Sequence, residues 1–225
     1  MNFAVIVFPG SNCDHDAYYI FKEVLNTSVD FVWHRQTDLK KYDAILIPGG
    51  FSYGDHLRTG AIARFSPIMD SIVKEAKLGK PVFGICNGFQ ILIESGLLPG
   101  ALIINKNIRF LSQNVVIEVA TQDSIYTRTM KKGHQLTMPI AHKQGNFIAD
   151  KDTLTLLMNE DRIAFKYIED DNTDSNPNGS MNSIAGILNK KRNVLGMMPH
   201  PERASESLLG SKDGLEIFKS IVGQS

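Results

Sequence analysis

The first hundred residues alternate short apolar runs with segments whose apolar side chains recur every three or four positions. Such runs are typical of strands buried on both faces of a parallel sheet, and the wider spacing is typical of helices packed on it. The pattern predicts strands over residues 4–8, 30–34, 44–47 and 81–85, and helices over 14–25, 62–78 and 87–95. Gly79 and Pro81 follow the second helix at positions typical of a helix end. This order predicts an α/β fold in three layers, with a largely parallel central sheet and helices on both faces.

From about Leu102 the pattern favours short strands with few helices between them. The predicted strands cover residues 115–120, 147–150, 154–158, 163–168, 184–188 and 194–198. We expect them to form a small antiparallel extension of the sheet. Residues 169–183 are polar and predict a surface loop, and residues 210–222 predict a last helix that Asp213 could cap. We interpret residues 1–225 as a single domain.

Composition excludes several classes of protein. The 225 residues carry 24 Lys and Arg against 24 Asp and Glu, and the net charge of zero argues against a nucleic-acid binder or a polybasic membrane anchor. The apolar run 3–8 is too short for a membrane span or a signal sequence. Two cysteines without a Cys-x-x-Cys pair make neither a disulfide framework nor a zinc site. We therefore expect a cytoplasmic protein with reduced thiols and no metal.

The strongest chemical signal is Gly84-Ile85-Cys86-Asn87-Gly88, where a predicted strand runs directly into a predicted helix. This Gly-x-Cys-x-Gly pattern is the cysteine form of a nucleophile elbow, a tight turn that exposes the central side chain at the carboxyl end of the sheet. The helix N-terminus would favour a thiolate, and the N–H of Asn87 would be free to bind an oxyanion. The alternative is that Cys86 is a small core residue between packing glycines. The strand–turn–helix context favours the nucleophile.

Two further segments supply the groups that such a nucleophile needs. His200 and Glu202 lie in Met198-Pro199-His200-Pro201-Glu202, where the prolines favour extended backbone and would place the two side chains on the same side. A carboxylate beside an imidazole is the arrangement of a general base and its orienting group. Strand 44–47 ends in Pro48-Gly49-Gly50, a loop whose N–H groups could supply a second oxyanion donor. The alternatives are a proline-rich surface turn and a plain glycine turn.

Other residues carry weaker signals. Cys13 lies in a loop after the first strand and has no base in its own motif, which favours a bystander near the site. His142 is equally compatible with a structural histidine and with a pocket wall, and residues 176–180 predict a turn. The chain contains neither a phosphate-loop motif nor Gly-x-Gly-x-x-Gly after a strand, which argues against a nucleotide site of either type.

The segment Gly84-Ile85-Cys86-Asn87-Gly88-Phe89-Gln90 resembles the signature of the class I (triad) glutamine amidotransferases, whose fold is flavodoxin-like. His200 with Glu202 resembles their His-x-Glu element, and residues 48–50 resemble their glycine loop. Three longer strings are similar to the glutaminase subunits of phosphoribosylformylglycinamidine synthases, which act in purine synthesis. The first string is residues 49–55 with 57–58 and 60–63, the second is residues 139–142, and the third is residues 176–180 with 184–187.

The resemblance implies a mechanism and partners. Cys86 would attack the side-chain amide of glutamine, His200 would act as base and then acid, and Glu202 would orient it. Backbone N–H groups of Gly50 and Asn87 would bind the oxyanion. The substrate-binding candidates are Gly49, Phe51, Ser52 and Gln90. The chain would need no cofactor, because ATP and Mg²⁺ would bind a large synthetase subunit, with a small accessory subunit completing the complex.

One departure and two alternatives remain. Lys143-Gln144-Gly145 stands where the resemblance leads us to expect Gly-Glu-Gly, so no carboxylate is available there. The alternative functions are a cysteine hydrolase of another family, acting on peptides or small carbonyl compounds, and a non-catalytic module that keeps the fold. Intact Cys86, His200 and Glu202 argue against the second.

Overall fold

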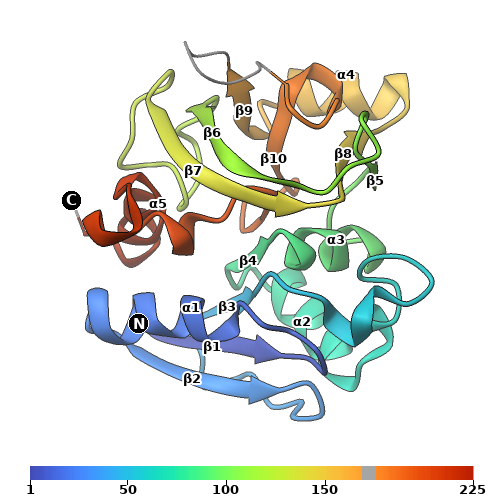
Figure 1. Ribbon diagram of the computed structural model, residues 1–225. Helices are drawn as coiled ribbons and strands as arrows, with labels where there is room; N and C mark the ends of the chain where they lie inside the picture. The colour runs from blue at the N-terminus through green and yellow to red at the C-terminus, as the bar shows by residue number, and fades with distance from the viewer. Residues whose placement is uncertain (169–175, 225) are drawn as a thin grey trace.

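A nine-stranded mixed sheet organises the fold in the computed structural model, which describes residues 1–168 and 176–224 (Figure 1). The strand order is β2-β1-β3-β4-β11-β10-β9-β6-β7. Neighbouring strands are parallel from β2 to β11 and antiparallel from β11 to β7. The parallel strands are β2 (Ser28–Trp33), β1 (Asn2–Val7), β3 (Ala44–Ile47), β4 (Val82–Ile85) and β11 (Val194–Met197). The antiparallel strands are β10 (Ile184–Leu188), β9 (Ile163–Ile168), β6 (Leu111–Val119) and β7 (Gln135–His142). The predicted α/β class and the antiparallel extension are confirmed.

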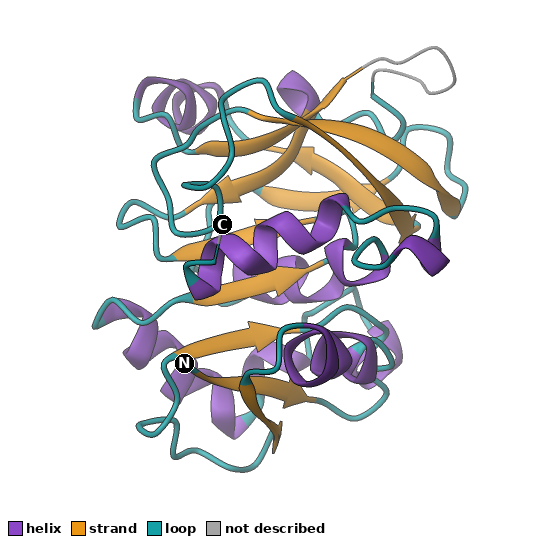
Figure 2. Cartoon of the chain, turned by 90° about the vertical axis from the view of Figure 1, so that its left-hand side faces the viewer, coloured by secondary structure: helices purple, strands orange, loops and turns teal. Residues whose placement is uncertain are grey.

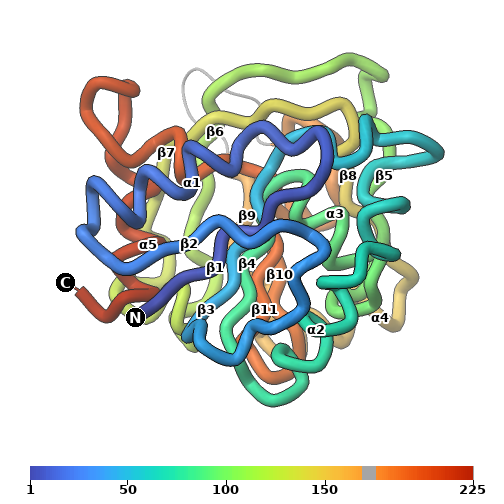
Figure 3. Tube along the Cα trace, turned by 90° about the horizontal axis from the view of Figure 1, so that it is seen from below, coloured from blue at the N-terminus to red at the C-terminus, as the bar shows by residue number. Residues whose placement is uncertain are grey.

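Helices cover both faces of the parallel strands. Helix α1 (Asp14–Tyr19), which continues as a π-helix (Ile20–Val24), lies with α5 (Asp213–Val222) on one side, and α2 (Pro67–Lys77) and α3 (Asn87–Glu94) lie on the other (Figure 3). Figure 2 shows helices in front of and behind the strands. Strand β5 (Ala101–Ile104) pairs with β8 (Gln144–Ile148) in a separate two-stranded sheet, and α4 (Lys151–Asn159) follows β8.

Aromatic side chains hold the helices on the α1 and α5 side against the sheet. Phe3 of β1 stacks on Phe21 with ring centroids 4.0 Å apart, and Phe218 of α5 meets Phe21 edge to face at 5.4 Å. Phe83 of β4 contacts Phe218 as well. All four rings are buried, so α1, the π-helix and α5 are anchored to the strands that end in the candidate site.

Segment 154–158 was predicted as a strand and lies instead in α4. The carboxylate of Asp150 accepts a hydrogen bond from Thr153 N at 2.7 Å, which caps the helix start. The helix packs through Leu157 and leaves Leu156 and Met158 exposed. The buried face of this helix is narrow, so its apolar residues do not show a clear helical period, and the segment was wrongly predicted as a strand.

Two predicted helix starts also need correction. The second helix begins at Pro67 rather than near residue 62, because proline lacks an N–H and fits the first helical turn. Asp213 does not cap α5: it is the first helical residue, and its Oδ2 accepts from Thr137 N of β7 at 2.7 Å. Asp213 thus joins a helix to the sheet.

Strands β5 and β7 were not predicted. Strand β7 contains Pro139, which cannot donate to a ladder and argues against a central strand. Because β7 is the last strand of the sheet, it has a neighbour on one side only and accommodates the proline. The loop predicted over residues 169–183 lies outside the described residues for 169–175. None of the described helices combines the length and the apolarity that crossing a bilayer requires.

Candidate active site

Four loops at the carboxyl ends of parallel strands converge on one place. Cys13 follows β1, Gly49 follows β3, Cys86 follows β4 and His200 follows β11. Strand β1 lies between β2 and β3, so the chain adds β2 on one side of β1 and then β3 on the other. Open α/β sheets bind ligands outside the carboxyl ends of their strands at such a reversal of strand order. The predicted catalytic residues Cys86 and His200 are therefore brought together although they are 200 − 86 = 114 positions apart in the sequence.

Cys86 occupies a strained turn between β4 and α3. Its φ is +50° and its ψ is −104°, a conformation that L-residues rarely adopt. Its N–H donates to Met197 O at 2.8 Å, and α3 begins at the next residue. A Cβ at Gly88 would lie 2.0 Å from Ile47 O, so only glycine lets α3 approach β3 this closely. The predicted elbow is confirmed, and the N–H of Asn87 lies in the first helical turn, where no intrahelical acceptor exists.

His200 and Glu202 form a buried pair. His200 Nδ1 lies 2.6 Å from Glu202 Oε1, and the two residues are 1% and 2% exposed. The extended backbone predicted here is wrong beyond His200, because Pro201–Arg203 forms a 3₁₀ turn that brings the carboxylate back to the imidazole. His200 N donates to Pro139 O at 2.8 Å, which ties the turn to β7. His200 Nε2 has no hydrogen-bond partner among the described residues.

The protonation of His200 depends on its neighbours. Burial alone would lower the pKa of its imidazole, but the charges of Glu202 and Cys86 outweigh burial and raise that pKa to about 10. The ring is therefore protonated at neutral pH.

The glycine loop lies against the same groups. A Cβ at Gly49 would lie 2.8 Å from His200 Cε1 and 3.4 Å from Cys86 Cβ, so glycine keeps this contact open. Gly50 has a φ of +125°, and a Cβ there would lie 2.6 Å from Asn12 N. The loop after β1 thus holds the glycine loop, and the two loops also form a β-bridge between Ser11 and Gly50.

The side chain of Asn87 connects the elbow to the segment after the glycine loop. Its Oδ1 accepts from Ser52 N at 3.1 Å, and its Nδ2 donates to Asp55 Oδ1 at 3.1 Å and to Gln90 Oε1 at 2.9 Å. Gln90 Nε2 in turn donates to Gln144 O at 2.6 Å. The predicted binding residues Ser52 and Gln90 are therefore both held by hydrogen bonds, whereas Phe51 is 47% exposed.

Cys13 lies closer to the pair than the sequence could show. The structure brings together one potential metal-ligand atom from each of Cys13, His200 and Glu202, all within 4.8 Å of one another. In the described part of the chain, this is the one group of three or more His, Cys, Asp or Glu residues close enough to hold a metal ion. Arg203 Nη2 donates to Cys13 Sγ at 3.1 Å, and this positive charge opposes a metal ion there. Burial, followed by the charge of Glu202, raises the pKa of Cys13 to about 12, so this thiol is protonated at neutral pH.

Comparison with known proteins assigns the chain to a family. Residues 1–215 match the family model described as CobB/CobQ-like glutamine amidotransferase domain. The chain belongs to this glutamine amidotransferase family. The predicted resemblance to glutamine amidotransferases is confirmed.

Individual relatives agree with this assignment. The amidotransferase is 54% identical to phosphoribosylformylglycinamidine synthase subunit PurQ of Koribacter versatilis, over 99% of this chain and 98% of that protein. It matches a chain of the PurLQS structure from Thermotoga maritima with a TM-score of 0.88 and 42% identity, over 99% and 97% of the two chains. The glutaminase domain of the Trypanosoma brucei CTPS, solved with acivicin, shares the fold with a TM-score of 0.62 at 14% identity, over 100% and 95% of the two chains.

The sequence did not identify the side chains that support the amidotransferase site from the antiparallel strands. His142 Nδ1 lies 3.1 Å from Asn105 Oδ1, which also accepts from Gly145 N at 3.0 Å. Asn178 and Ser180 are buried and bond to Gly145 O. The predicted turn at residues 176–180 thus holds the segment that faces Gln90, and His142 is a structural residue beside the site. The signals in the sequence were His142, predicted as a structural histidine or a pocket wall, and the Asn-Pro-Asn-Gly-Ser turn, which has no charged residue.

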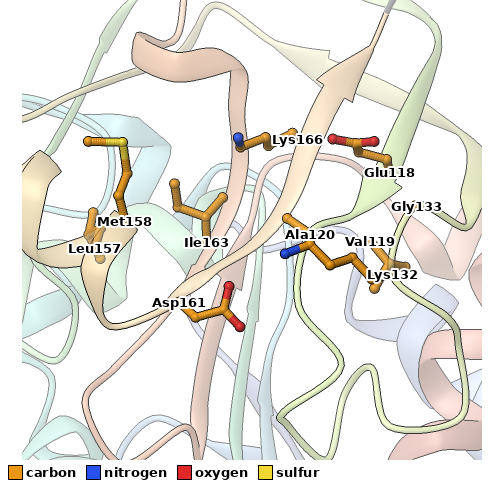
Figure 4. A pocket seen from close by; sticks show the side chains of 10 residues that line it. All are labelled: Glu118, Val119, Ala120, Lys132, Gly133, Leu157, Met158, Asp161, Ile163 and Lys166. Carbon is orange, nitrogen blue, oxygen red and sulfur yellow. The ribbon is translucent and has the colours of Figure 1, made fainter.

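A separate hollow of about 510 Å³ opens between β6, β9 and α4, away from the triad residues (Figure 4). Its charged side chains are of both signs, with Glu118 and Asp161 facing the same space as Lys132 and Lys166. None of the predicted site residues lines it. The hollow therefore shares no lining residue with the candidate active site.

Proposed function

We propose that this amidotransferase is the glutaminase subunit of a phosphoribosylformylglycinamidine synthase. It hydrolyses glutamine to glutamate and ammonia, and the ammonia passes to a synthetase subunit that makes formylglycinamidine ribonucleotide. The observation that carries the proposal is the 54% identity to a PurQ protein over nearly the whole of both chains. The elbow at Cys86 and the buried His200–Glu202 pair supply the groups that amide hydrolysis needs.

Cys86 is the proposed nucleophile, and its thiolate attacks the side-chain amide carbon of glutamine. The protonated His200 then gives its proton to the departing nitrogen, and ammonia leaves as the glutamyl thioester forms. Neutral His200 next takes a proton from water, which attacks the thioester and releases glutamate. Glu202 orients the imidazole and stabilises its charged form through the 2.6 Å contact. The free Nε2 of His200 is the atom that exchanges these protons.

Backbone N–H groups of Gly50 and Asn87 are the proposed oxyanion donors. Asn87 offers its N–H at the start of α3, where the helix dipole also favours negative charge. Removing one such donor typically costs about 3 kcal/mol of transition-state stabilisation. Gly49, Phe51, Ser52 and Gln90 are proposed to contact the glutamine.

The partners of the proposed subunit follow from the same comparison. PurLQS is the name of the solved complex from Thermotoga maritima. We infer a large ATP-dependent synthetase subunit, which binds ATP and Mg²⁺, and a small accessory subunit. No cofactor is assigned to this chain, and a cytoplasmic location is proposed.

The test compares glutamine with free ammonia as the nitrogen source in the reconstituted complex. Cys86→Ala should abolish glutamate release and glutamine-dependent synthesis but leave ammonia-dependent synthesis intact. Cys13→Ala is the matched control and should retain glutamine-dependent activity. Loss of both activities in Cys86→Ala would mean that Cys86 is structural. No glutamate from the wild type with partner, ATP and nucleotide substrate would refute the proposed function.

A further inference from the structure

We propose that Asp55 binds the α-ammonium group of the glutamine substrate and so distinguishes an amino acid from a simple amide. The inference rests on the proposed glutaminase function and adds a residue that selects the substrate.

Asp55 shares a hydrogen-bond donor with Gln90, one of the proposed substrate-binding residues. The same atom, Asn87 Nδ2, donates to Asp55 Oδ1 at 3.1 Å and to Gln90 Oε1 at 2.9 Å. The two acceptor oxygens are therefore no more than about 6 Å apart. An ammonium group is small enough to contact both.

The opposite wall limits the distance between the thiol and Gln90. Cys86 Sγ lies 3.7 Å from Ala141 O, and Gln90 Nε2 lies 2.6 Å from Gln144 O. These two carbonyls are three positions apart along the chain, and an extended chain covers at most about 10 Å over three positions. The bonds from the amide carbon of glutamine to its α-nitrogen span about 5 Å. Gln90 lies one helical turn after Cys86, with its N–H donating to Cys86 O at 3.2 Å, so a glutamine whose amide lies at Cys86 is long enough to bring its α-nitrogen to Gln90 and Asp55.

Charge singles out Asp55 among the groups at this end. In the segments 48–55, 86–90 and 139–146 it is the one carboxylate. It makes no ion pair within the described residues, and Arg58 of the same loop is bound to Glu94 at 2.6 Å. Burial raises the pKa of Asp55 to about 6, against the opposing hydrogen bond from Asn87, and the group remains mostly ionised at neutral pH. A half-buried carboxylate without a cation is what an incoming ammonium group would stabilise.

The backbone holds Asp55 in a strained position. Tyr53 and Asp55 have φ values of +56° and +52°, which cost energy in residues other than glycine. Tyr53 N donates to Pro9 O, and its hydroxyl contacts Ser66 Oγ at 2.7 Å. These contacts and Asn87 impose the conformation that directs Asp55 to Asn87.

The test uses Asp55→Asn, which keeps an acceptor for Asn87 and removes only the charge. The two substrates are L-glutamine and glutaramate, which lacks only the α-amino group. Release of glutamate or glutarate is measured in the complex with the synthetase partner. The variant should raise the KM for glutamine about 10- to 100-fold, the range for a hydrogen bond to a charged group, with little change in kcat. Its kcat/KM for glutaramate should change less than threefold. Asp70→Asn, an exposed aspartate of α2, is the matched control and should behave as wild type.

A second measurement does not need the partner. Alkylation of Cys86 by 6-diazo-5-oxo-L-norleucine, an amino-acid electrophile, should slow in Asp55→Asn, while alkylation by iodoacetamide keeps its wild-type rate. Equal losses on glutamine and glutaramate, or slower reaction with both electrophiles, would show a structural role and overturn the inference. An unchanged KM and unchanged alkylation rates would overturn it too. Failure of the wild type to release glutamate would instead refute the proposed function, and this inference with it.

Discussion

At the level of single residues, substitutions of His200 and Glu202 can distinguish the proposed base from the group that orients it. His200→Ala removes the group that moves protons and should lower kcat for glutamine by about 10³-fold, within the usual range for a general acid–base. Glu202→Gln keeps a polar partner for Nδ1 but removes the charge that raises the pKa of His200. We expect a smaller loss, about 10- to 100-fold, in kcat measured in the complex. Equal losses in the two variants would contradict the orienting role.

The residues that could be predicted share one property: local sequence determines their geometry. Gly84, Cys86 and Gly88 specify the elbow by spacing alone, and the proximity of His200 to Glu202 needs only a short segment. Cys13 was predicted only as a residue near the site, because its approach to Glu202 depends on the order in which β1 and β11 enter the sheet. Asp55 lies in one of the strings that carry the resemblance, but nothing in that string predicts its contact with Asn87, which is set by a strained loop.

At the level of elements, the close approach of α3 to β3 positions the N–H of Asn87. In Gly88→Ala the added Cβ would lie 2.0 Å from Ile47 O, so the helix start must move away from the strand. We expect the free energy of unfolding to fall by about 1–3 kcal/mol, as for other overpacked sites, and kcat to fall as well. Denaturant unfolding and the glutaminase assay measure the two effects.

A second glycine provides a control that distinguishes an effect on stability from an effect on the geometry of the site. A Cβ at Gly79 would meet nothing within 4 Å, but its φ of +101° disfavours any side chain. Gly79→Ala at the end of α2 should therefore lower stability by backbone strain and leave kcat unchanged. If Gly88→Ala retained full kcat, the packing of α3 on β3 would not be what positions Asn87.

The elements themselves show where patterns fail. Strands β1, β3, β4 and β11 were predicted because they are apolar runs buried on both faces, and α3 was predicted because its apolar residues recur with a helical period. Helix α4 was misread because Leu157 is its only buried side chain, so that capping by Asp150 decides its structure. Strand β7 was missed because Pro139 is tolerated only at an edge, and which strand is at the edge is a property of the whole sheet.

At the level of the whole molecule, the two halves of the sheet contribute different parts of the site. The parallel strands supply Cys86, Gly49 and His200 at their carboxyl ends, and the antiparallel strands supply the segment from Ala141 to Gln144 that faces them. His142 lies at this junction, 3% exposed, with its pKa lowered to about 3 by burial and by the charge of His200. Assembly of the site therefore buries a neutral histidine.

This burial predicts how stability depends on pH. Below a pH of about 6.5 the unfolded chain protonates His142 and the folded chain does not, so stability falls as pH falls from about 6.5 towards 3. At about 1.4 kcal/mol per pH unit, the wild type should lose about 2 kcal/mol between pH 7.5 and pH 5.0 through this residue. His142→Gln removes the titrating group and should lose correspondingly less over the same interval in denaturant unfolding. The same pH dependence in both proteins would mean that His142 is already protonated in the folded chain. Burial between the two halves of the sheet would then not keep its imidazole neutral.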